Sequence, residues 1–356
     1  MTRRDLLASL GAVSLHADTA PFQLRWRLGA DYPSYVKGGA MAAVSGAVVY
    51  AGGMTQPWRE TEAAWCYTPS DKNWKPLPPM PQGRAYTHGA GGLDSLIVTG
   101  GRWRFHGTSD VFRLRRSSGD WRWDVLPSLQ QARVTPNVAA AGSQVLVAGG
   151  GDWDRQQGGA FLPRLVDKVE VLDLAHLDQG WRTAAPFPAG ARVASNVASA
   201  GGRAYLFGGY DLWYEKEQRH LEIKRDAWRY DFSADRWEKL PDLPAHMYGG
   251  AAVAVRDRYI LILGGVLEWP GEGNRRESSV LVDPKRKVLL GQYSTRVLIF
   301  DVSTRSYTWA SEPMPRGHND IRACLLGDSI YVLGGENSDV TLSNTTADFQ
   351  VATVVP

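Results

Sequence analysis

The stretch Leu146-Val147-Ala148-Gly149-Gly150 ends a short apolar run with a glycine pair, and this pattern decides the fold. Six apolar runs end in this way, with the first glycine of each pair at residues 52, 100, 149, 208, 264 and 334. Successive copies are therefore 48, 49, 59, 56 and 70 residues apart. A self-similar unit of about 50 residues indicates an array of small β-sheets that bury their apolar faces against one another.

The sequence around each glycine pair predicts a four-stranded unit. A strand of small apolar residues comes first, the run with the glycine pair is second, a third strand follows, and a Trp opens the fourth. The expected first strands are residues 84–91, 133–141, 192–200, 247–254 and 318–325. Pro-rich turns such as Leu240-Pro241-Asp242-Leu243-Pro244 then lead to the next unit.

The fourth-strand Trp residues indicate how the array closes. Five of them follow a glycine pair, namely Trp74, Trp121 or Trp123, Trp181, Trp237 and Trp309. A sixth, Trp26, lies before the first pair, so residues 22–28 are expected to complete the last unit beside a strand over residues 347–353. We therefore expect an all-β, six-bladed kelch-type β-propeller closed by the N-terminal strand, forming one domain over residues 21–356.

Composition narrows the classes of function. A formal net charge of +3 on 356 residues is too mild to favour nucleic-acid binding. Cys66 and Cys324 fall in different repeats and have no metal-ligand spacing, so no metal site and no cofactor are expected. The N-terminus has Arg3-Arg4 before a short apolar run, which predicts an export signal over residues 1–20 and a periplasmic or secreted protein with no membrane span. A disordered or helical N-terminal tail is the alternative.

The loops after the glycine pairs are rich in Trp. The residues are Trp58, Trp103, Trp153, Trp213 and Trp269. Because these loops share one face of a propeller, the Trp side chains are expected to surround a ligand, and indole rings suit the C–H faces of sugars. In the alternative, each Trp covers the end of its own sheet.

Polar residues recur at the starts of the expected first strands. Side chains four residues apart on a strand point the same way, which predicts polar pairs directed into the central channel. The pairs are Arg84/His88, Arg133/Asn137, Arg192/Asn196 and His318/Arg322. A ring of Arg side chains would bind an anion such as a carboxylated sugar. In the alternative, these arginines brace neighbouring blades against loop carbonyls and acids.

Long insertions follow three of the glycine pairs, over residues 151–166, 210–225 and 266–295. Long loops in a compact fold are usually functional. The second insertion combines acids with Arg and His, which suits general acid–base work. A solvated charged loop is the alternative interpretation.

The blade pattern resembles the kelch family across residues 21–356. Within it, three segments are similar to the bacterial N-acetylneuraminate epimerase family: Gly208-Gly209 through Arg225-Asp226-Ala227 to Trp237-Glu238-Lys239-Leu240, then Gln292-Tyr293-Ser294-Thr295, and finally Gly334-Gly335-Glu336. This resemblance implies a periplasmic six-bladed propeller that interconverts sialic acid anomers by acid–base catalysis without a cofactor.

The resemblance also implies site residues. The catalytic carboxylate of that family follows the glycine pair of the fourth blade, where this chain has Tyr210, and Arg225 matches the family's Arg before Asp-Ala. Glu215, Glu217 and Glu222 are the neighbouring acids that would act with Arg225, and Glu336 follows another glycine pair. The copper site of galactose oxidase, another kelch protein, needs a Tyr-His dipeptide that this chain lacks.

The sequence therefore predicts an exported propeller that binds a sugar, most suitably an acidic one, and exchanges its anomers. A non-catalytic carbohydrate-binding module and a protein-interaction scaffold are the alternatives, so the partner is a small sugar or glycan, or else a protein.

Overall fold

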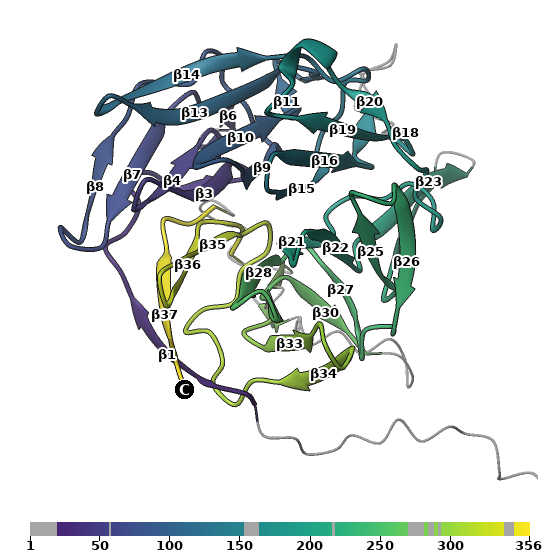
Figure 1. Ribbon diagram of the computed structural model, residues 1–356. Helices are drawn as coiled ribbons and strands as arrows, with labels where there is room; N and C mark the ends of the chain where they lie inside the picture. Colours follow the sequence, from purple (N-terminus) through teal and green to yellow (C-terminus); the bar gives the residue numbers. More distant parts are fainter. Residues whose placement is uncertain are drawn as a thin grey trace, which may run out of the picture.

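The computed structural model describes residues 20–56, 58–152, 164–215, 218–269, 281–283, 288–290, 293–337 and 345–356. Within these ranges the chain is almost entirely β-strand and turn, and the 3-10 turn η1 (Leu177–Gln179) is the one helical element described. The predicted all-β class is confirmed, and the arrangement is consistent with a kelch-type β-propeller (Figure 1). No described helix is long and apolar enough to cross a membrane.

Six sheets of the described chain have four antiparallel strands each, in an order that runs from the innermost strand to the outermost. The first sheet has β3 (Ala40–Val44), β4 (Ala47–Ala51), β7 (Ala64–Thr68) and β8 (Asn73–Pro76). The second has β9 (His88–Gly91), β10 (Ser95–Thr99), β13 (Val111–Ser117) and β14 (Asp120–Leu126). The third has β15 (Asn137–Ala141), β16 (Gln144–Ala148), β19 (Val169–Asp173) and β20 (Arg182–Thr183).

The remaining three sheets follow the same order. The fourth has β21 (Asn196–Ala200), β22 (Arg203–Phe207), β25 (Ala227–Asp231) and β26 (Arg236–Leu240). The fifth has β28 (Ala251–Val255), β29 (Tyr259–Leu263), β33 (Val297–Asp301) and β34 (Ser306–Trp309). The sixth has β35 (Arg322–Leu326), β36 (Ser329–Leu333), β37 (Phe349–Val355) and β1 (Gln23–Leu28).

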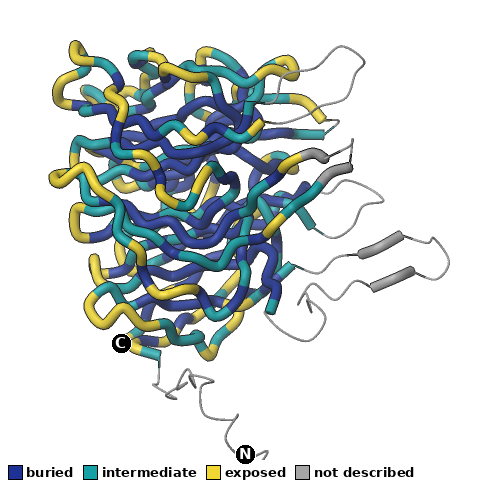
Figure 2. Tube along the Cα trace, turned by 90° about the vertical axis from the view of Figure 1, so that its right-hand side faces the viewer, coloured by how far each residue is buried: buried dark blue, intermediate teal, exposed yellow. Residues whose placement is uncertain are grey.

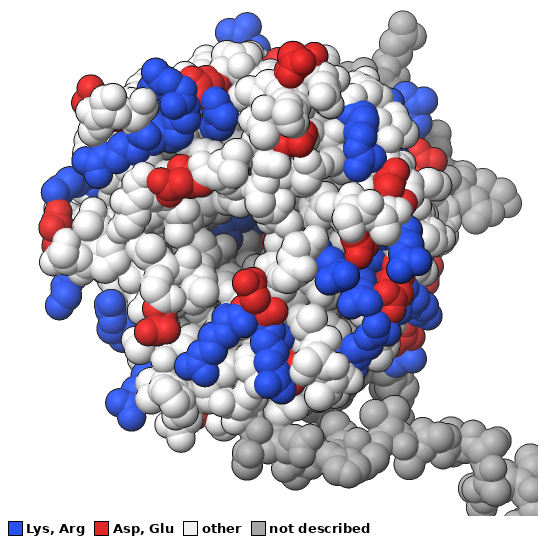
Figure 3. All heavy atoms as spheres, in the orientation of Figure 1, with Lys and Arg blue, Asp and Glu red and all other residues white. Residues whose placement is uncertain are grey.

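The sixth sheet takes its outer strand from the beginning of the described chain. β1 pairs antiparallel with β37 along its whole length, and Trp26 lies opposite Ala352. The inner strands contact one another in the order β3, β9, β15, β21, β28 and β35, and β35 also packs against β3. Figure 3 shows the molecule hollowed at its centre, in the orientation of Figure 1.

Smaller paired strands follow the glycine pairs. They are β2 (Val36–Lys37) with β5 (Met54–Thr55) and β6 (Arg59–Glu60), β11 (Arg102–Trp103) with β12 (His106–Gly107), β17 (Gly151–Asp152) with β18 (Arg164–Leu165), β23 (Tyr210–Glu215) with β24 (Gln218–Ile223), β27 (His246–Tyr248) with β30 (Val266–Glu268), and β31 (Leu281–Asp283) with β32 (Val288–Leu290).

The glycine pairs are required by the backbone. Gly149 and Gly150 have φ values of 64° and 98°, which side chains disfavour. A Cβ atom on Gly149 would also collide with the carbonyl oxygen of Arg192 from the next repeat. Each pair therefore lets the second strand end against the neighbouring sheet.

The inner strands begin about four residues later than the sequence indicated. They start at His88, Asn137, Asn196, Ala251 and Arg322. The reason is a left-handed residue two positions earlier in the chain: Tyr86, Thr135, Ala194, Gly249 and Asp320 have φ values between 51° and 69°. Because the backbone turns at these residues, the alternation of a strand does not extend back to Arg84, Arg133, Arg192 or His318.

The hydrophobic core lies between adjacent sheets. One cluster joins Phe22, just before β1, and Leu24 of β1 to Leu261 of β29 and Ile330 of β36. Figure 2 shows buried residues running through the interior of the stacked strands and exposed residues at their turns. Burial of β1 side chains in this core makes the N-terminal strand part of the packed fold.

Candidate functional site

Three arginines expected at the channel mouth lie inside the fold. The Arg133 guanidinium forms an ion pair with Glu170, and both side chains are fully buried. Arg192 binds Asp226 at 2.7 and 3.0 Å, and Arg84 binds Asp110 at 2.6 Å. Arg133 also donates to the carbonyls of Gly149 and Lys168.

These three arginines do not form the expected ring at the mouth. Each guanidinium binds carbonyls or acids, as in the bracing alternative, but these partners belong to its own repeat and not to a neighbouring sheet. The turn before each inner strand takes the arginine out of that strand, and its side chain is buried near the start of the third strand of the same sheet. His318 occupies the same place in the sixth sheet, where its Nε2 lies 2.7 Å from Asp348 Oδ2.

The residues that open the inner strands tie neighbouring sheets together. Arg322 Nε donates to the carbonyl of Gly39 at 2.6 Å, and its Nη2 donates to the carbonyl of Thr87 at 3.0 Å. Asn137 Oδ1 accepts from the backbone amide of Ser195, in the next repeat, at 3.0 Å. The Asn196 side-chain amide instead donates within its own sheet, to the carbonyl of Phe207 at 3.3 Å. Arg322 thus spans the first, second and sixth sheets.

His88 lies beside this guanidinium. Burial lowers the pKa of the His88 imidazole well below its usual value, and the charge of Arg322 lowers it further. A neutral imidazole at this position is a poor receptor for an anion.

The loop Trp residues do not form one ring. Trp103 packs on the turn at Gly83, Trp213 stacks on His220 with ring centres 5.4 Å apart, and Trp269 packs on Trp309. Trp153 lies outside the described residues. Trp58 alone among the described loop Trp residues adjoins a buried polar cluster, because the Lys37 ammonium lies 4.8 Å from its ring centre.

Of the predicted hairpin acids, Glu222 is the one whose side chain is described, and its ion-pair partner is not Arg225. Glu222 pairs with Lys224 at 2.7 Å, and Arg225 lies 3.7 Å from Asp242. Glu217 and the side chain of Glu215 lie outside the described structure. The structure therefore does not join Arg225 and Glu222 into one acid–base unit.

Six residues at the glycine-pair end of the ring form what we call the mouth cluster: Lys37, Tyr86, Tyr293, Asn319, Asp320 and Glu336. The Lys37 ammonium forms an ion pair with Glu336 Oε1. Glu336 Oε2 lies 3.3 Å from the Tyr293 hydroxyl and 3.4 Å from Asn319 Nδ2, which both donate to it. The cluster brings together a cation, a carboxylate and aromatic rings.

Local backbone geometry builds this cluster. Lys37 ends β2 and pairs with Met54, the residue after the first glycine pair. Asn319 bridges in the same way to Glu336, the residue after the last pair. Turns before the inner strands β3, β9 and β35 supply Lys37, Tyr86 and Asp320, so sequence-distant residues meet where three inner strands begin.

The pKa values of three mouth-cluster side chains, Lys37, Asp320 and Tyr293, are shifted for different physical reasons. Burial is the largest influence on Lys37 and lowers its pKa. The charge of Glu336, the hydrogen bond to Glu336 and the charges of Tyr86 and Asp320 together outweigh burial, so the pKa of Lys37 is raised overall and the ammonium persists. Burial raises the pKa of the Asp320 carboxyl, and the Glu336 charge adds to this, although Arg322 opposes it. Burial, followed by the charge of Glu336, raises the pKa of the Tyr293 hydroxyl, which therefore stays a donor.

The rim of the cluster adds a second ion pair and more aromatic surface. Arg102 Nε binds Glu60 Oε1 at 2.8 Å, and the guanidinium lies over the rings of Tyr86 and Phe105. Tyr210, at the position of the expected carboxylate, packs edge-on against Tyr248 with ring centres 5.0 Å apart. A ligand here would meet aromatic faces, two cations and two carboxylates.

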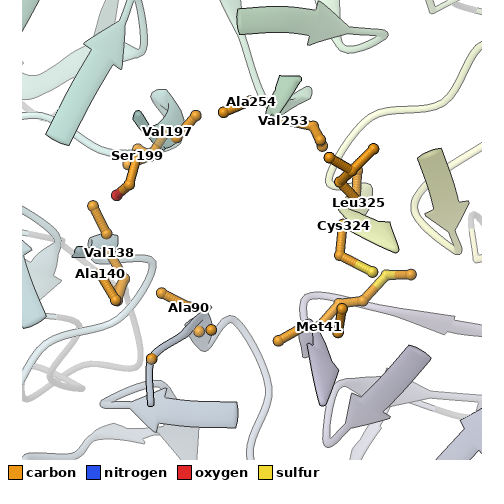
Figure 4. A pocket seen from close by; sticks show the side chains of 18 of the residues that line it. Met41, Ala90, Val138, Ala140, Val197, Ser199, Val253, Ala254, Cys324 and Leu325 are labelled. Carbon is orange, nitrogen blue, oxygen red and sulfur yellow. The ribbon is translucent and has the colours of Figure 1, made fainter. Parts of the chain in front are cut away.

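A cavity of about 500 Å³ lies between the inner strands (Figure 4). Small and apolar side chains line it, among them Ala90, Val138, Ala140, Val253 and Leu325. Such a surface offers little chemistry, so the mouth cluster is the better candidate site. In the described part of the chain, no three His, Cys, Asp or Glu side chains gather as metal ligands would.

Most residues of the mouth cluster were not predicted from the sequence. Glu336 was a candidate, whereas Lys37, Tyr86, Tyr293, Asn319 and Asp320 were not. The segment just before each inner strand could have indicated these residues. Its residues pair with those that follow a glycine pair, as Lys37 does with Met54 and Asn319 with Glu336, and this pairing sets the position of the site.

Comparison with known proteins confirms the two resemblances drawn from the sequence. A family model described as N-acetylneuraminate epimerase matches residues 164–269. The N-acetylneuraminate epimerase of Haemophilus influenzae (strain PittEE) is 34% identical over 99 residues, or 28% of this chain and 26% of that protein. The chain thus spans about a quarter of that relative's length in the match.

Kelch proteins match longer segments at lower identity. Kelch-like protein terF of Aspergillus terreus is 26% identical over 256 residues, which cover 60% of this chain and 53% of that protein. Kelch-like protein 34 of Homo sapiens is 28% identical over 209 residues, which cover 57% of this chain and 29% of that protein. The epimerase match includes Tyr210 and Arg225 and excludes Lys37 and Glu336.

Proposed function

We propose that the chain is a six-bladed propeller, one domain over residues 21–356 that β1 closes, and that its mouth cluster binds a sugar and exchanges its anomers. The pairing of β1 with β37 and the contacts between successive inner strands support the closure. The observation that carries the function is the Lys37–Glu336 ion pair beside Trp58, with Tyr293 and Asn319 donating to the carboxylate.

Each part of the cluster has a counterpart in a sugar. The exposed Trp58 ring suits the C–H face of a pyranose. Tyr293 and Asn319 suit its hydroxyl groups, and Lys37 and Arg102 supply positive charge for the carboxylate of an acidic sugar. The similarity to N-acetylneuraminate epimerases supports an acidic sugar of that type.

The ion pair supplies both proton transfers that anomer exchange needs. Glu336 takes the proton of the anomeric hydroxyl, the bond between the anomeric carbon and the ring oxygen breaks, and the ring oxygen takes a proton from the Lys37 ammonium. The open-chain carbonyl form results. Reclosure on the other face of the carbonyl reverses both transfers: Lys37 takes the proton of the ring-closing hydroxyl, and Glu336 gives its proton to the former carbonyl oxygen. Both residues return to their starting states, so no cofactor is consumed.

The test is saturation-transfer and exchange NMR on the purified protein with N-acetylneuraminate and with a neutral analogue that lacks the carboxylate. We expect saturation transfer to both sugars, stronger for the acid, and faster exchange between anomers. Silence with both sugars would overturn the proposal.

The same spectra separate two alternatives. Binding without exchange would indicate a non-catalytic carbohydrate-binding module, a function that the aromatic rim around Tyr86 and Arg102 would also suit. Absence of binding would favour a protein-interaction scaffold, a role that kelch-type folds also host.

We further propose that residues 1–20 direct export to the periplasm or medium, because Arg3-Arg4 precedes a short apolar run. Residues 1–19 lie outside the described residues. In a bacterial host the full chain should appear in the periplasmic fraction with a shortened N-terminus by mass spectrometry, and Arg3→Lys with Arg4→Lys should hold it in the cytoplasm. A full-length cytoplasmic product would contradict export.

A further inference from the structure

Asp320 is the member of the mouth cluster that the proposed proton transfers do not use. Its Oδ1 accepts from Arg322 Nη1 at 2.9 Å. Its Oδ2 is buried and has no hydrogen-bond partner among the described residues. The backbone of Gly38 packs against this oxygen, since a Cβ added there would lie 3.0 Å from it.

Charged and titratable groups face Asp320 from several elements. Lys37 of β2 and Arg322 of β35 are positive, and Glu336 is negative. The charge of Asp320 also contributes to raising the pKa of three tyrosines: Tyr86 before β9, Tyr293 before β33 and Tyr50 of β4. Two carboxyl groups, Asp320 and Glu336, therefore share one buried corner in which Lys37 pairs with Glu336.

The two carboxyl groups differ in the number of hydrogen-bond donors around them. A buried acceptor without a partner is costly when it carries charge, and two neighbouring carboxylates repel each other. Glu336 has an ammonium and two further donors, whereas Oδ2 of Asp320 has none described. When the surroundings of two neighbouring carboxyl groups differ in this way, one group is favoured in the ionised form and the other in the protonated form.

We propose that Asp320 is a positioning residue of this site, a carboxyl group that stays protonated on Oδ2 at neutral pH and so leaves Glu336 as the ionised carboxylate facing the sugar. The role in exchange rests on the proposed function, but the protonation state does not. An ionised Asp320 would add a second negative charge beside Glu336 and weaken the binding of an acidic sugar.

The protonation state can be tested without any sugar. A carboxyl group whose folded pKa is raised stabilises the fold below the ordinary Asp range, and this stability is lost as pH rises towards the raised pKa. Urea unfolding of wild type and Asp320→Asn between pH 4 and pH 8 should therefore show the variant gaining relative stability as pH rises. The reverse trend would mean that Asp320 is ionised and would overturn the proposal.

Two control variants calibrate the trend. Asp328→Asn, at an exposed turn before β36, should show no pH-dependent difference from wild type. Asp226→Asn should show the opposite trend when the scan is extended down to pH 2. Burial raises the pKa of the Asp226 carboxyl, but Arg192 lowers it overall, so this variant should lose relative stability as pH rises from about 2 to about 5 and then stay level.

If Asp320→Asn does not fold, the infrared spectrum of wild type at pH 7 decides. A carbonyl stretch from a protonated carboxyl group supports the proposal, and its absence overturns it.

A second experiment measures sugar binding and anomer exchange at the mouth cluster. An ionised Asp320 would repel an acidic sugar, so its removal in Asp320→Asn would tighten binding of N-acetylneuraminate at pH 7 more than binding of the neutral analogue. Such a selective gain would contradict the proposed role of Asp320, whereas a neutral carboxyl group predicts equal effects on the two sugars. Absence of exchange in wild type would overturn the proposed function alone, because the unfolding data still report on Asp320.

Discussion

Glu336 is the residue on which the proposed chemistry depends most. Glu336→Gln keeps the shape of the side chain but removes its basicity, and general base catalysis is worth about 10²–10⁴-fold. We expect exchange to fall at least about 100-fold while sugar binding persists, measured by exchange and saturation-transfer NMR. Glu62→Gln, on an exposed loop residue, is the matched control and should exchange like wild type. Equal rates in Glu336→Gln and wild type would exclude Glu336 as the base.

Arg133 illustrates a buried ion pair that serves the fold. Glu170 also accepts from the Gln130 amide at 2.7 Å, so removal of Arg133 leaves a buried carboxylate without its charge partner. Breaking such a pair costs about 3–5 kcal/mol. Arg133→Met should lower the free energy of unfolding by that order, and Arg133→Met with Glu170→Gln should cost much less than the sum of the single changes.

Sugar binding by folded Arg133→Met provides the matching functional measurement. A bracing residue should weaken acidic and neutral sugars equally, if at all. A selective loss of the acidic sugar would instead show that Arg133 recognises the carboxylate. Urea unfolding and NMR binding together distinguish the two roles.

At the level of single residues, the sequence predicted arginine side chains directed into the channel, and the structure instead buries three of them in ion pairs. Arg84 and Arg192 were placed in the channel by extending strand alternation through Tyr86 and Ala194, whose left-handed backbone no propensity foretells. Lys37 and Asp320 were missed because their partners come from other repeats. Contacts between distant repeats are the part of a site that one repeat's pattern cannot reveal.

Among the secondary-structure elements, the turn from β25 to β26 contains a strongly perturbed acid. Asp231 Oδ1 accepts from the Ser233 hydroxyl at 2.7 Å and from the amides of Ser233 and Ala234. The hydrogen bond from Ser233 is the largest cause that lowers the pKa of Asp231, to about 2. The turn is therefore stabilised by the ionised form.

This turn predicts a pH dependence of stability. A carboxyl group with a lowered folded pKa stabilises above its ordinary pKa of about 4, and the stability is lost as pH falls towards 2. Asp231→Ala should thus be destabilised at pH 6 and approach wild type near pH 2, as measured by urea unfolding. Asp120→Ala, at the exposed first residue of β14, should differ little at either pH. A difference that is constant with pH would contradict the role of the ionised turn.

Most strands could be predicted from the sequence because local residues determine them. Apolar runs that end in a glycine pair became the second strand of each sheet, and Trp26 correctly marked an outer strand. The starts of the first strands were wrong by about four residues because the turns at Thr135 and Asp320 depend on hydrogen bonds to neighbouring sheets, such as that from the Thr135 amide to the carbonyl of Tyr86. Such bonds exist only once the sheets are assembled.

For the whole molecule, the proposed closure makes β1 a component that the rest of the chain needs. Phe22 and Leu24 are buried between the fifth and sixth sheets. Arg25, the residue after Leu24, is exposed. Without β1, strand β37 would present an unpaired edge, and exposed edges promote aggregation. Residues 31–356 alone should therefore melt well below the full chain.

A peptide of residues 20–30 should restore what the truncation removes. A ligand that binds only the folded state raises stability with its concentration, so the melting temperature of residues 31–356 should rise as peptide is added. The peptide with Leu24→Ala should act much more weakly, because it loses a buried side chain worth about 2–5 kcal/mol. The peptide with Arg25→Ala should match wild type. If residues 31–356 melted like the full chain and ignored the peptide, the sixth sheet would not need β1 and the proposed closure would fail.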